Sequence, residues 1–190
     1  MIYIAVLLLT LLLSGPANPT QIPPRTIDKA HSRVTFTVTK WGFAEVEGRF
    51  YDFAGTIAFD EQHPERSQVD WRVRVDSVQT GAPNRDKALQ GSDYFDTARF
   101  PEMHFISDRV NPLGGEQFEV TGQMTIRDKT RPLTIRTTYG GTHAIPGEGA
   151  YSIFQTEFMI DRYDYNVRGG STLGGVISRE VHVKLIAAVR

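Results

Sequence analysis

Eight stretches of this chain alternate apolar and polar residues one by one. The clearest are 118–127, FEVTGQMTIR, and 32–40, SRVTFTVTK. Successive side chains of a β-strand point to opposite faces of a sheet, so an alternation with period two predicts strands that bury one face. No amphipathic helical pattern is long enough to cover a sheet, so the chain is predicted to be all-β. The remaining alternating stretches are 46–60, 67–78, 102–110, 133–139, 150–160 and 176–189.

Eight antiparallel strands with one apolar face solve the problem of their exposed edges best by closing into a barrel. The sequence therefore predicts a single eight-stranded antiparallel barrel, whose interior holds packed side chains or one ligand. The second strand, 46–60, is far longer than the usual strand of about 5–6 residues. A change of phase at Tyr51–Asp52 predicts a bulge within it. Long strands predict a deep, narrow and apolar lumen that suits a long hydrocarbon chain.

One stretch, 85–105, interrupts the strands. It opens as a short surface helix, and Gly91 favours a helix end in the left-handed conformation, which a residue without a Cβ adopts easily. Three aromatic residues then crowd into a loop, Tyr94, Phe95 and Phe100. A solvated loop does not need them, so we expect this single helical excursion to fold down as a lid over one end of an apolar interior.

The 190 residues include 21 Lys and Arg, 22 Asp and Glu, and no Cys. The length fits one domain, and the net charge of 21 − 22 = −1 gives no attraction to nucleic acid or to an anionic membrane surface. The absence of Cys excludes disulfides and Cys-based metal or nucleophile motifs. The five His residues are scattered without the spacing of a zinc site, so neither a metal nor another cofactor is predicted.

The chain begins with an apolar run, MIYIAVLLLTLLL. This run is shorter than the about 20 residues that span a bilayer, and Gly15 and Ala17 follow it at small-x-small spacing. The pattern favours a secretory signal peptide at 1–17, cleaved at or near Ala17. A Pro-rich linker at 18–25 and one β-barrel domain at 26–190 complete the predicted organisation. The alternative is an uncleaved membrane anchor, because no Lys or Arg precedes the apolar run.

An ordered series of short motifs runs over about 26–189. They are Asp28-x-x-His31-Ser32, Gly48-Arg49-Phe50, Arg85-Asp86-x-x-Leu89, Tyr94-Phe95-Asp96, Phe100-Pro101, Thr121-Gly122-x-Met124-Thr125-Ile126 and Arg162-x-Asp164-Tyr165. In these motifs the chain resembles the YceI family. The resemblance implies an extended lipocalin-like antiparallel barrel, exported to the periplasm, whose members hold a polyisoprenoid or another long amphiphile in the lumen.

Three positions depart from the family pattern. Lys40-Trp41 stands where the family usually has a His, which changes the residues expected at the mouth of the lumen. Asp128 stands where a Gly is usual in a hairpin turn, and Asn166 replaces the Gly that usually follows the Arg-x-Asp-aromatic run. Asp and Asn tolerate a positive φ better than most residues, so we expect both turns to form.

We predict that one apolar face of the strands lines a ligand-binding lumen. The candidate lining residues are Val34, Phe36, Val38, Phe50, Ile57, Val73, Phe105, Val120, Met124, Ile135, Phe154 and Phe158. The same residues could instead form an ordinary packed core, since composition does not distinguish a lumen filled by side chains from one occupied by a ligand.

Five further residues are candidates for contact with a ligand head group, namely His31, Arg85, Asp86, Arg162 and Asp164. Arg162 and Asp164 flank a Gly-rich loop, where an Arg could pair bidentately with a phosphate or carboxylate. The alternative for this pair is a salt bridge at the barrel rim. For Arg85 and Asp86 the alternative is an ion pair at the start of a helix.

Asp28, His31 and Ser32 have the residue types of a hydrolytic triad. A triad needs the nucleophile within hydrogen-bond reach of the base, whereas adjacent residues on a strand point to opposite faces. The sequence also lacks the G-x-S-x-G pattern of a nucleophile elbow. These residues therefore indicate a turn that leads into a strand.

Together these features predict a periplasmic binding or carrier protein, and not an enzyme, that holds a polyisoprenoid or another long-chain amphiphile. Two alternatives remain open: an enzyme that acts on a lipid or isoprenoid in the lumen, and an interaction module whose barrel is a filled scaffold. Nucleic acid is not a predicted partner. No protein partner or oligomeric state is assigned, a dimer being one alternative.

Overall fold

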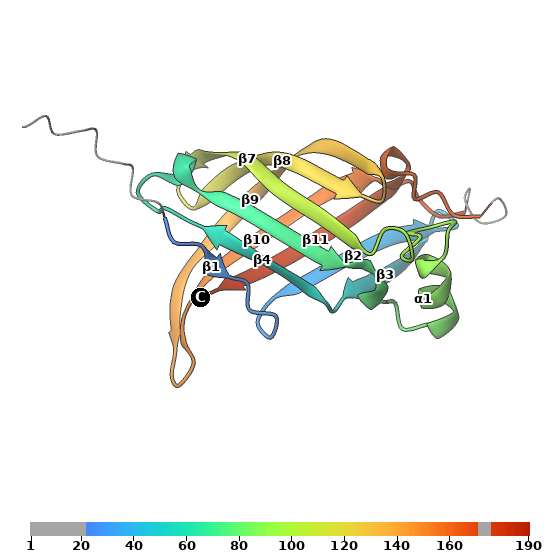
Figure 1. Cartoon of the computed structure of the whole chain (residues 1–190), viewed down its shortest axis with the longest axis horizontal. Coiled ribbons are helices and arrows are strands. Elements are labelled where there is room, and N and C mark those ends of the chain that lie inside the picture. Colours follow the sequence, from blue (N-terminus) through green and yellow to red (C-terminus); the bar gives the residue numbers. More distant parts are fainter. Residues whose placement is uncertain (1–21, 171–175) are drawn as a thin grey trace, which may run out of the picture.

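The computed structural model describes residues 22–170 and 176–190 (Figure 1). The predicted signal peptide, 1–17, and the first part of the predicted linker lie outside the described residues. The described chain is mostly β-strand, with one α-helix and three short 3₁₀ helices. This confirms the predicted all-β class with one helical excursion.

The strands form one antiparallel sheet, which curls on itself around an apolar interior (Figure 1). They are β1 (Arg25–Thr26), β2 (Arg33–Lys40), β3 (Ala44–Phe50), β4 (Phe53–Ala58), β5 (Gln68–Arg74), β6 (Val78–Gln79), β7 (Glu102–Gly114), β8 (Gln117–Ile126), β9 (Lys129–Ile145), β10 (Gly149–Asp161) and β11 (Glu180–Val189). The helices are η1 (Pro64–Arg66), η2 (Val75–Ser77), α1 (Pro83–Gln90) and η3 (Arg162–Tyr165). The strand order in the sheet is β1-β4-β5-β7-β8-β9-β10-β11-β2-β3-β6.

The sheet has eleven strands where eight were predicted. One difference lies at Tyr51 and Asp52, which separate β3 from β4 where a bulge was expected in one long strand. The Tyr51 N–H donates to the Ser77 carbonyl (3.3 Å), and the Asp52 carbonyl accepts from the Arg74 N–H (2.8 Å), so the strand bends at this point. The other two additional strands, β1 and β6, have two residues each, too few to show an alternation in the sequence.

The longest strand, β9, extends beyond the alternating stretch 133–139 at both ends. The hairpin turn before it is confined to Arg127 and Asp128. Arg127, and not Asp128, takes the positive φ, at 54°. At the far end, β9 continues through Gly140 and Gly141, which fall at a β-bulge in the pairing with β10. Glycine thus marks a local irregularity of the strand rather than its end.

The short strand β1 joins two sides of the curl. Thr26 pairs with Thr56 of β4, while its N–H donates to the Arg190 carbonyl at the end of β11 (3.0 Å). Ile27 forms an isolated antiparallel bridge with Val189 of β11. Because β4 and β11 are not neighbours in the strand order, these contacts show that the sheet curls far enough to bring them together.

The helical excursion covers one end of the curl (Figure 1). Asp86 of α1 accepts a hydrogen bond from the Thr80 N–H (2.8 Å), which fixes the helix to the chain that leaves β6. The helix ends in extended backbone at Gly91, with a φ of −71°, and not in the left-handed conformation that was expected. The side chains of Tyr94 and Phe95 pack against the apolar core, which is the covering role predicted for this loop.

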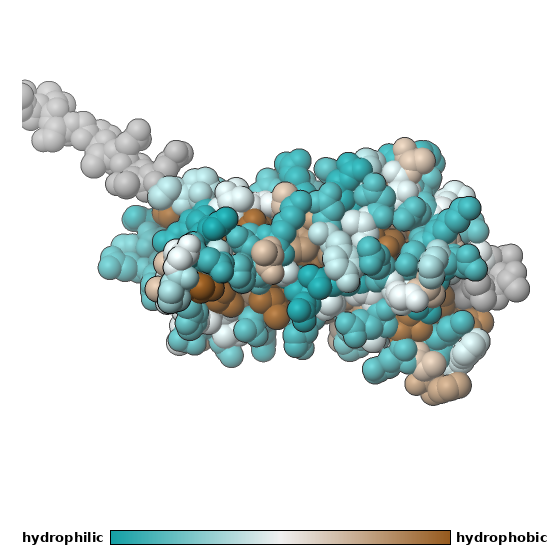
Figure 2. Space-filling model, turned by 90° about the horizontal axis from the view of Figure 1, so that it is seen from below, coloured by the Kyte–Doolittle hydropathy of each residue, from teal (hydrophilic) through white to brown (hydrophobic). Residues whose placement is uncertain are grey.

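The apolar and polar faces of the strands separate as the alternation predicts. The face of the molecule seen in Figure 2 is mostly hydrophilic, with a few apolar patches. Buried residues of the inner face come from nearly every long strand, and they include Val34, Phe50, Trp71, Phe105, Val120 and Phe154. The burial of this face supplies the main favourable free energy of the fold.

The close approach of β7 and β8 gives a test of this packing. Gly122 of β8 is buried, and a Cβ on it would lie 2.2 Å from the Ile106 carbonyl oxygen and 2.8 Å from the Ser107 Cα. We expect Gly122→Ala to lower the free energy of unfolding by about 1–3 kcal/mol, the usual cost of overpacking. Gly140→Ala is the matched control, because its nearest neighbours lie at 3.6 Å. Urea denaturation measures both variants, and equal stability of the two would contradict the close packing.

Candidate ligand-binding lumen

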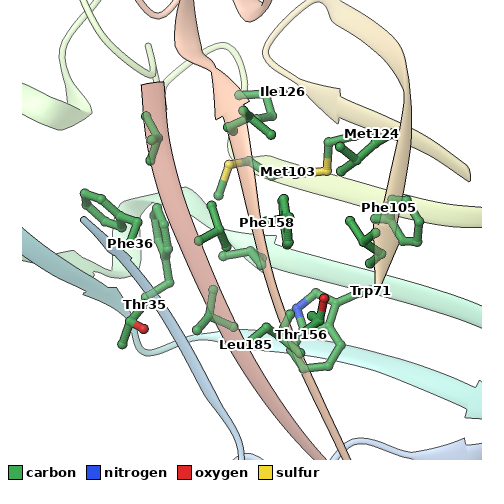
Figure 3. Close-up of a pocket in the computed structure, with 18 of the residues that line it drawn as sticks. Thr35, Phe36, Trp71, Met103, Phe105, Met124, Ile126, Thr156, Phe158 and Leu185 are labelled. Carbon is green, nitrogen blue, oxygen red and sulfur yellow. The ribbon is translucent and has the colours of Figure 1, made fainter. Parts of the chain in front are cut away.

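A cavity of about 530 Å³ lies inside the curled sheet, with almost entirely apolar walls (Figure 3). This volume is within the range of about 300–1,000 Å³ that is usual for small-molecule sites. All twelve residues predicted to line a lumen line this cavity: Val34, Phe36, Val38, Phe50, Ile57, Val73, Phe105, Val120, Met124, Ile135, Phe154 and Phe158. Nine strands contribute to the wall, so the site follows from the curl of the sheet and not from one loop.

Aromatic side chains fill one end of the cavity. The ring of Phe59 lies between those of Phe118, Tyr139 and Phe154, with centroid distances of 5.4, 4.8 and 5.1 Å. Phe118 stands at the start of β8, whereas Ile126 at the other end of β8 lines the cavity near the lid. We call the Phe59 cluster the closed end of the lumen.

The opposite end is polar, and we call it the mouth. Four residues with polar side chains line the cavity there, Lys40, Thr80, Asn84 and Arg85. The lid covers this end through Phe95, whose ring meets that of Phe50 edge to face at 6.0 Å. An apolar cavity with one closed and one polar end has the polarity of a long amphiphile.

The segments at the mouth are held together by Arg127, whose side chain is 14% exposed. Its guanidinium donates to the carbonyls of Tyr94 (2.7 Å) and Asn166 (2.6 Å), and it lies 3.7 Å from the carboxylate of Asp96, a buried residue of the lid loop. Asn166 has a φ of 58°, which agrees with the expectation that Asn supports this turn in place of Gly. The lid and the loop after η3 are therefore fixed to the same strand end.

Arg162 lines the cavity and is buried, with 5% of the residue exposed. It donates to the carbonyls of Val167 (2.7 Å), Arg168 (2.6 Å), Ser178 (2.8 Å) and Ile177 (3.0 Å). The sequence suggested a ligand head group or a rim carboxylate as its partner, whereas these acceptors belong to the main chain. Arg162 thus positions the two chain segments that border the mouth.

Asp161, next to Arg162, carries the ion pair at this rim. Burial by itself raises the pKa of the Asp161 carboxyl, but hydrogen bonds from the Arg179 guanidinium and the Tyr163 N–H outweigh it and hold the pKa below its usual value. Asp164, predicted as a head-group contact, is exposed and does not line the cavity. The acidic groups at this rim therefore serve the local fold.

Arg85 and Asp86 lie together at the start of α1 with different surroundings. Arg85 is exposed and lines the mouth, and its guanidinium donates to the Thr80 hydroxyl and carbonyl (2.7 Å each). Asp86 binds Thr80 as well, so both residues brace the chain before the helix. Of the five head-group candidates, the structure places Arg85 and Arg162 on the cavity wall.

His31 lies beyond the closed end, away from the mouth. Its ring is within 3.1 Å of the Asp28 carboxylate and 4.9 Å from the ring of Tyr151. Burial by itself raises the pKa of Asp28, but hydrogen bonds from the His31 side chain and N–H and from the Ala30 N–H outweigh it and lower the pKa. Ser32 points inward and accepts from the Ala188 N–H (2.9 Å). The residue types of a triad thus form the turn that leads into β2.

Some lining residues were absent from the predicted set. Met103 follows the parity of Phe105 on β7, and Leu185 lies on the apolar side of the alternating stretch 176–189, so the alternation could have identified both. Thr156 is polar, and it enters the apolar face by donating to the Arg136 carbonyl (2.7 Å). Val167 comes from an irregular segment, where no period in the sequence indicates direction.

Two further searches cover the described residues. Between 22 and 170 and between 176 and 190, no group of three or more His, Asp or Glu side chains is placed to hold a metal ion. The same residues contain no helix with the length and apolar character needed to cross a membrane.

The fold and the cavity define a class of protein in which a curled antiparallel sheet encloses a single apolar lumen. Comparison with known proteins gives the family: a model of the YceI-like domain matches residues 26–188, so this chain belongs to the YceI family. It is 33% identical over 144 residues to Protein YceI of Escherichia coli O157:H7, covering 75% of each chain. It is 31% identical over 145 residues to a UPF0312 protein of Pseudomonas syringae pv. tomato, covering 75% of this chain and 76% of that one.

Solved structures show the same fold. BcnA of Burkholderia cenocepacia superposes with a TM-score of 0.79 at 25% identity, covering 86% of this chain and 99% of BcnA. A polyisoprenoid binding domain from Saccharophagus degradans, implicated in plant cell wall breakdown, superposes with a TM-score of 0.68 at 17% identity, covering 87% and 97% of the two chains.

The positioning role of Arg162 can be tested by Arg162→Ala. The variant leaves buried carbonyls without a donor, and each one that water does not reach costs about 1–3 kcal/mol. We expect lower stability in urea and a similar loss of affinity for a prenyl phosphate and for the prenyl alcohol of equal tail length. Arg85→Ala is the control, because that side chain is exposed at the mouth. A loss for Arg162→Ala confined to the phosphate would show direct contact with a head group instead.

Proposed function

We propose that this protein binds and carries a long-chain amphiphile of the polyisoprenoid type in its lumen. The observation that carries the proposal is the apolar cavity of about 530 Å³, whose lining beside the lid includes Asn84 and Arg85. Membership of the YceI family and the shared fold with a polyisoprenoid binding domain support this choice of ligand class.

The size of the cavity favours a ligand over a packed core. Protein interiors are close-packed, with few voids larger than a water molecule. At about 24 cal/mol per Å³, an empty apolar cavity of about 530 Å³ would cost on the order of 10 kcal/mol. That figure is comparable with the whole stability of a typical domain, about 5–15 kcal/mol. A hydrocarbon chain removes this cost, because it restores contacts along the whole wall.

The two ends of the lumen set the orientation of the ligand. The aromatic closed end offers no charged group to a head group, whereas Asn84 and Arg85 present polar atoms at the mouth. We therefore place the end of the tail against Phe59 and the head group beside α1. Arg85 could donate to a phosphate or carboxylate at this position.

A binding role accounts for the site better than catalysis or a filled scaffold. An enzyme needs a nucleophile or base beside the bound substrate, and Ser32 and His31 serve the turn before β2. A filled scaffold needs a packed interior, so the cavity supports a ligand-binding role over a scaffold. We also propose that the signal peptide at 1–17 directs the chain to the periplasm, where a soluble carrier would move an insoluble lipid.

The distinction between a lumen and a packed core can be tested at Met124. In Figure 3 the side chains of Met103 and Met124 both extend into the cavity. In a packed core Met124→Trp would cost about 1–3 kcal/mol by overpacking. In an open lumen the indole occupies ligand space, so we expect the ligand-free variant to keep or gain thermal stability while uptake of a fluorescent prenyl lipid falls sharply.

Met159→Trp is the matched control, because Met159 of β10 is 55% exposed. It should change neither the melting temperature nor lipid uptake. A strongly destabilised Met124→Trp variant, or one that takes up lipid as well as the wild type, would contradict the proposed lumen.

A further inference from the structure

The hairpin between β2 and β3 ends in two exposed aromatic side chains. Trp41 is 61% exposed and Phe43 is 79% exposed, and their rings stack with centroids 6.4 Å apart. The Lys40 ammonium lies 4.0 Å from the centroid of the Trp41 ring. We call Lys40, Trp41, Gly42 and Phe43 the hairpin tip. Its aromatic rings bury little surface inside the protein, so the stability of the fold does not explain them.

The backbone conformation of the hairpin tip is also unfavourable for Trp41. Trp41 has a φ of 56° and Gly42 a φ of 76°. The Phe43 N–H donates to the Lys40 carbonyl (3.2 Å), so Trp41 and Gly42 are the two central residues of a turn. Turns with both central φ values positive favour Asn-Gly or Asp-Gly, and a bulky side chain at such a φ is strained. A strained conformation that displays an exposed Trp points to a role outside the fold.

The hairpin tip projects from the rim of the lumen. Lys40 lines the cavity and forms a β-bridge with Ile177, which lines it as well. The Trp41 N–H donates to the Val176 carbonyl (2.8 Å). In Figure 1 the β2–β3 hairpin ends on the same side of the molecule as α1, which covers the mouth. The exposed rings therefore stand beside the opening of the cavity.

We propose that the hairpin tip is a membrane-docking element that seats the mouth of the lumen on the surface of a lipid bilayer. Trp and Phe rings partition into the bilayer interface, and a neighbouring Lys keeps its ammonium among the head groups. A stable protein interface buries about 800 Å² on each partner, far more than two side chains on a turn provide. Two rings are enough for weak, reversible contact with a bilayer.

The docking role rests on the proposed carrier function, because an insoluble amphiphile must pass between a bilayer and the lumen. A mouth seated on the membrane lets the tail transfer without crossing water. The net charge of the chain is −1, so attraction to anionic lipid does not drive the contact. Insertion of the aromatic rings drives the contact, and binding of the protein to the bilayer should therefore be insensitive to salt.

The two tryptophans of the chain allow a direct test. Trp71 is buried, so Trp71→Phe leaves Trp41 as the sole reporter at the hairpin tip. On addition of phosphatidylcholine vesicles we expect its fluorescence to shift to the blue and to be quenched by brominated acyl chains. Phosphatidylglycerol in the vesicles or added salt should change this little. In the Trp71→Phe background, the further substitution Phe43→Ser should weaken partitioning of the protein into vesicles at least about tenfold, since one Phe ring buried in the bilayer is lost. The substitution Met159→Ser in the same background changes a residue elsewhere on the surface and should leave the partitioning unchanged.

A second measurement uses the otherwise wild-type chain. The double variant Trp41→Gly, Phe43→Ser relieves the strained φ and should melt no lower than the wild type. It should take up fluorophore-tagged geranylgeraniol added from ethanol as well as the wild type does, yet transfer it between vesicles at least about tenfold more slowly. Vesicle flotation of both proteins supplies the binding readout without Trp71→Phe.

Unchanged Trp41 fluorescence with vesicles, or equal flotation and transfer by the double variant, would overturn the docking role. Capture of a protein partner by the hairpin tip in the absence of vesicle binding would also overturn it. If the wild type binds vesicles through the hairpin tip but takes up no geranylgeraniol, the docking role stands and the carrier function fails.

Discussion

The structure depends on one apolar sheet face that curls around a space too wide for its own side chains to fill. Burial of that face drives folding, because the strands present apolar residues on one side only. The same curl keeps opposite walls apart, so residues such as Val120 and Phe158 meet a cavity instead of each other. The favourable burial of the sheet and the cost of the cavity thus have the same origin, and the proposed hydrocarbon ligand would remove that cost.

The mouth shows how this fold keeps irregular segments in place near an apolar cavity. Buried carbonyl groups need donors, and single side chains supply them here: Arg162 donates to four carbonyls and Arg127 to two. The planar guanidinium suits this task, since it offers five donors and stays charged. A cation that the sequence marks as a ligand contact can therefore be part of the scaffold, and Arg85 at the mouth is the more accessible head-group partner.

The sequence predicts the strands in which apolar and polar residues alternate, and the prediction fails in segments that lack this alternation. Alternation along each strand identified lining residues such as Phe36 and Met124, because parity alone decides which face a side chain takes. It missed the break after Phe50, where hydrogen bonds from a distant turn bend the strand. Parity also says nothing about Val167, which reaches the cavity from a loop held by a buried Arg. The exposed Trp41 was noticed only as a departure from the family pattern, and its role at the rim required the hairpin to be placed in space.

The central claim is that the lumen holds a removable long-chain amphiphile. Native mass spectrometry of the purified full chain, after incubation with vesicles that contain a long-chain prenyl alcohol, tests it most directly. The account predicts a protein ion with the added mass of one prenyl alcohol, which extraction with organic solvent removes to leave a folded protein. A single ion with the mass of the polypeptide alone, the same before and after extraction, would contradict it.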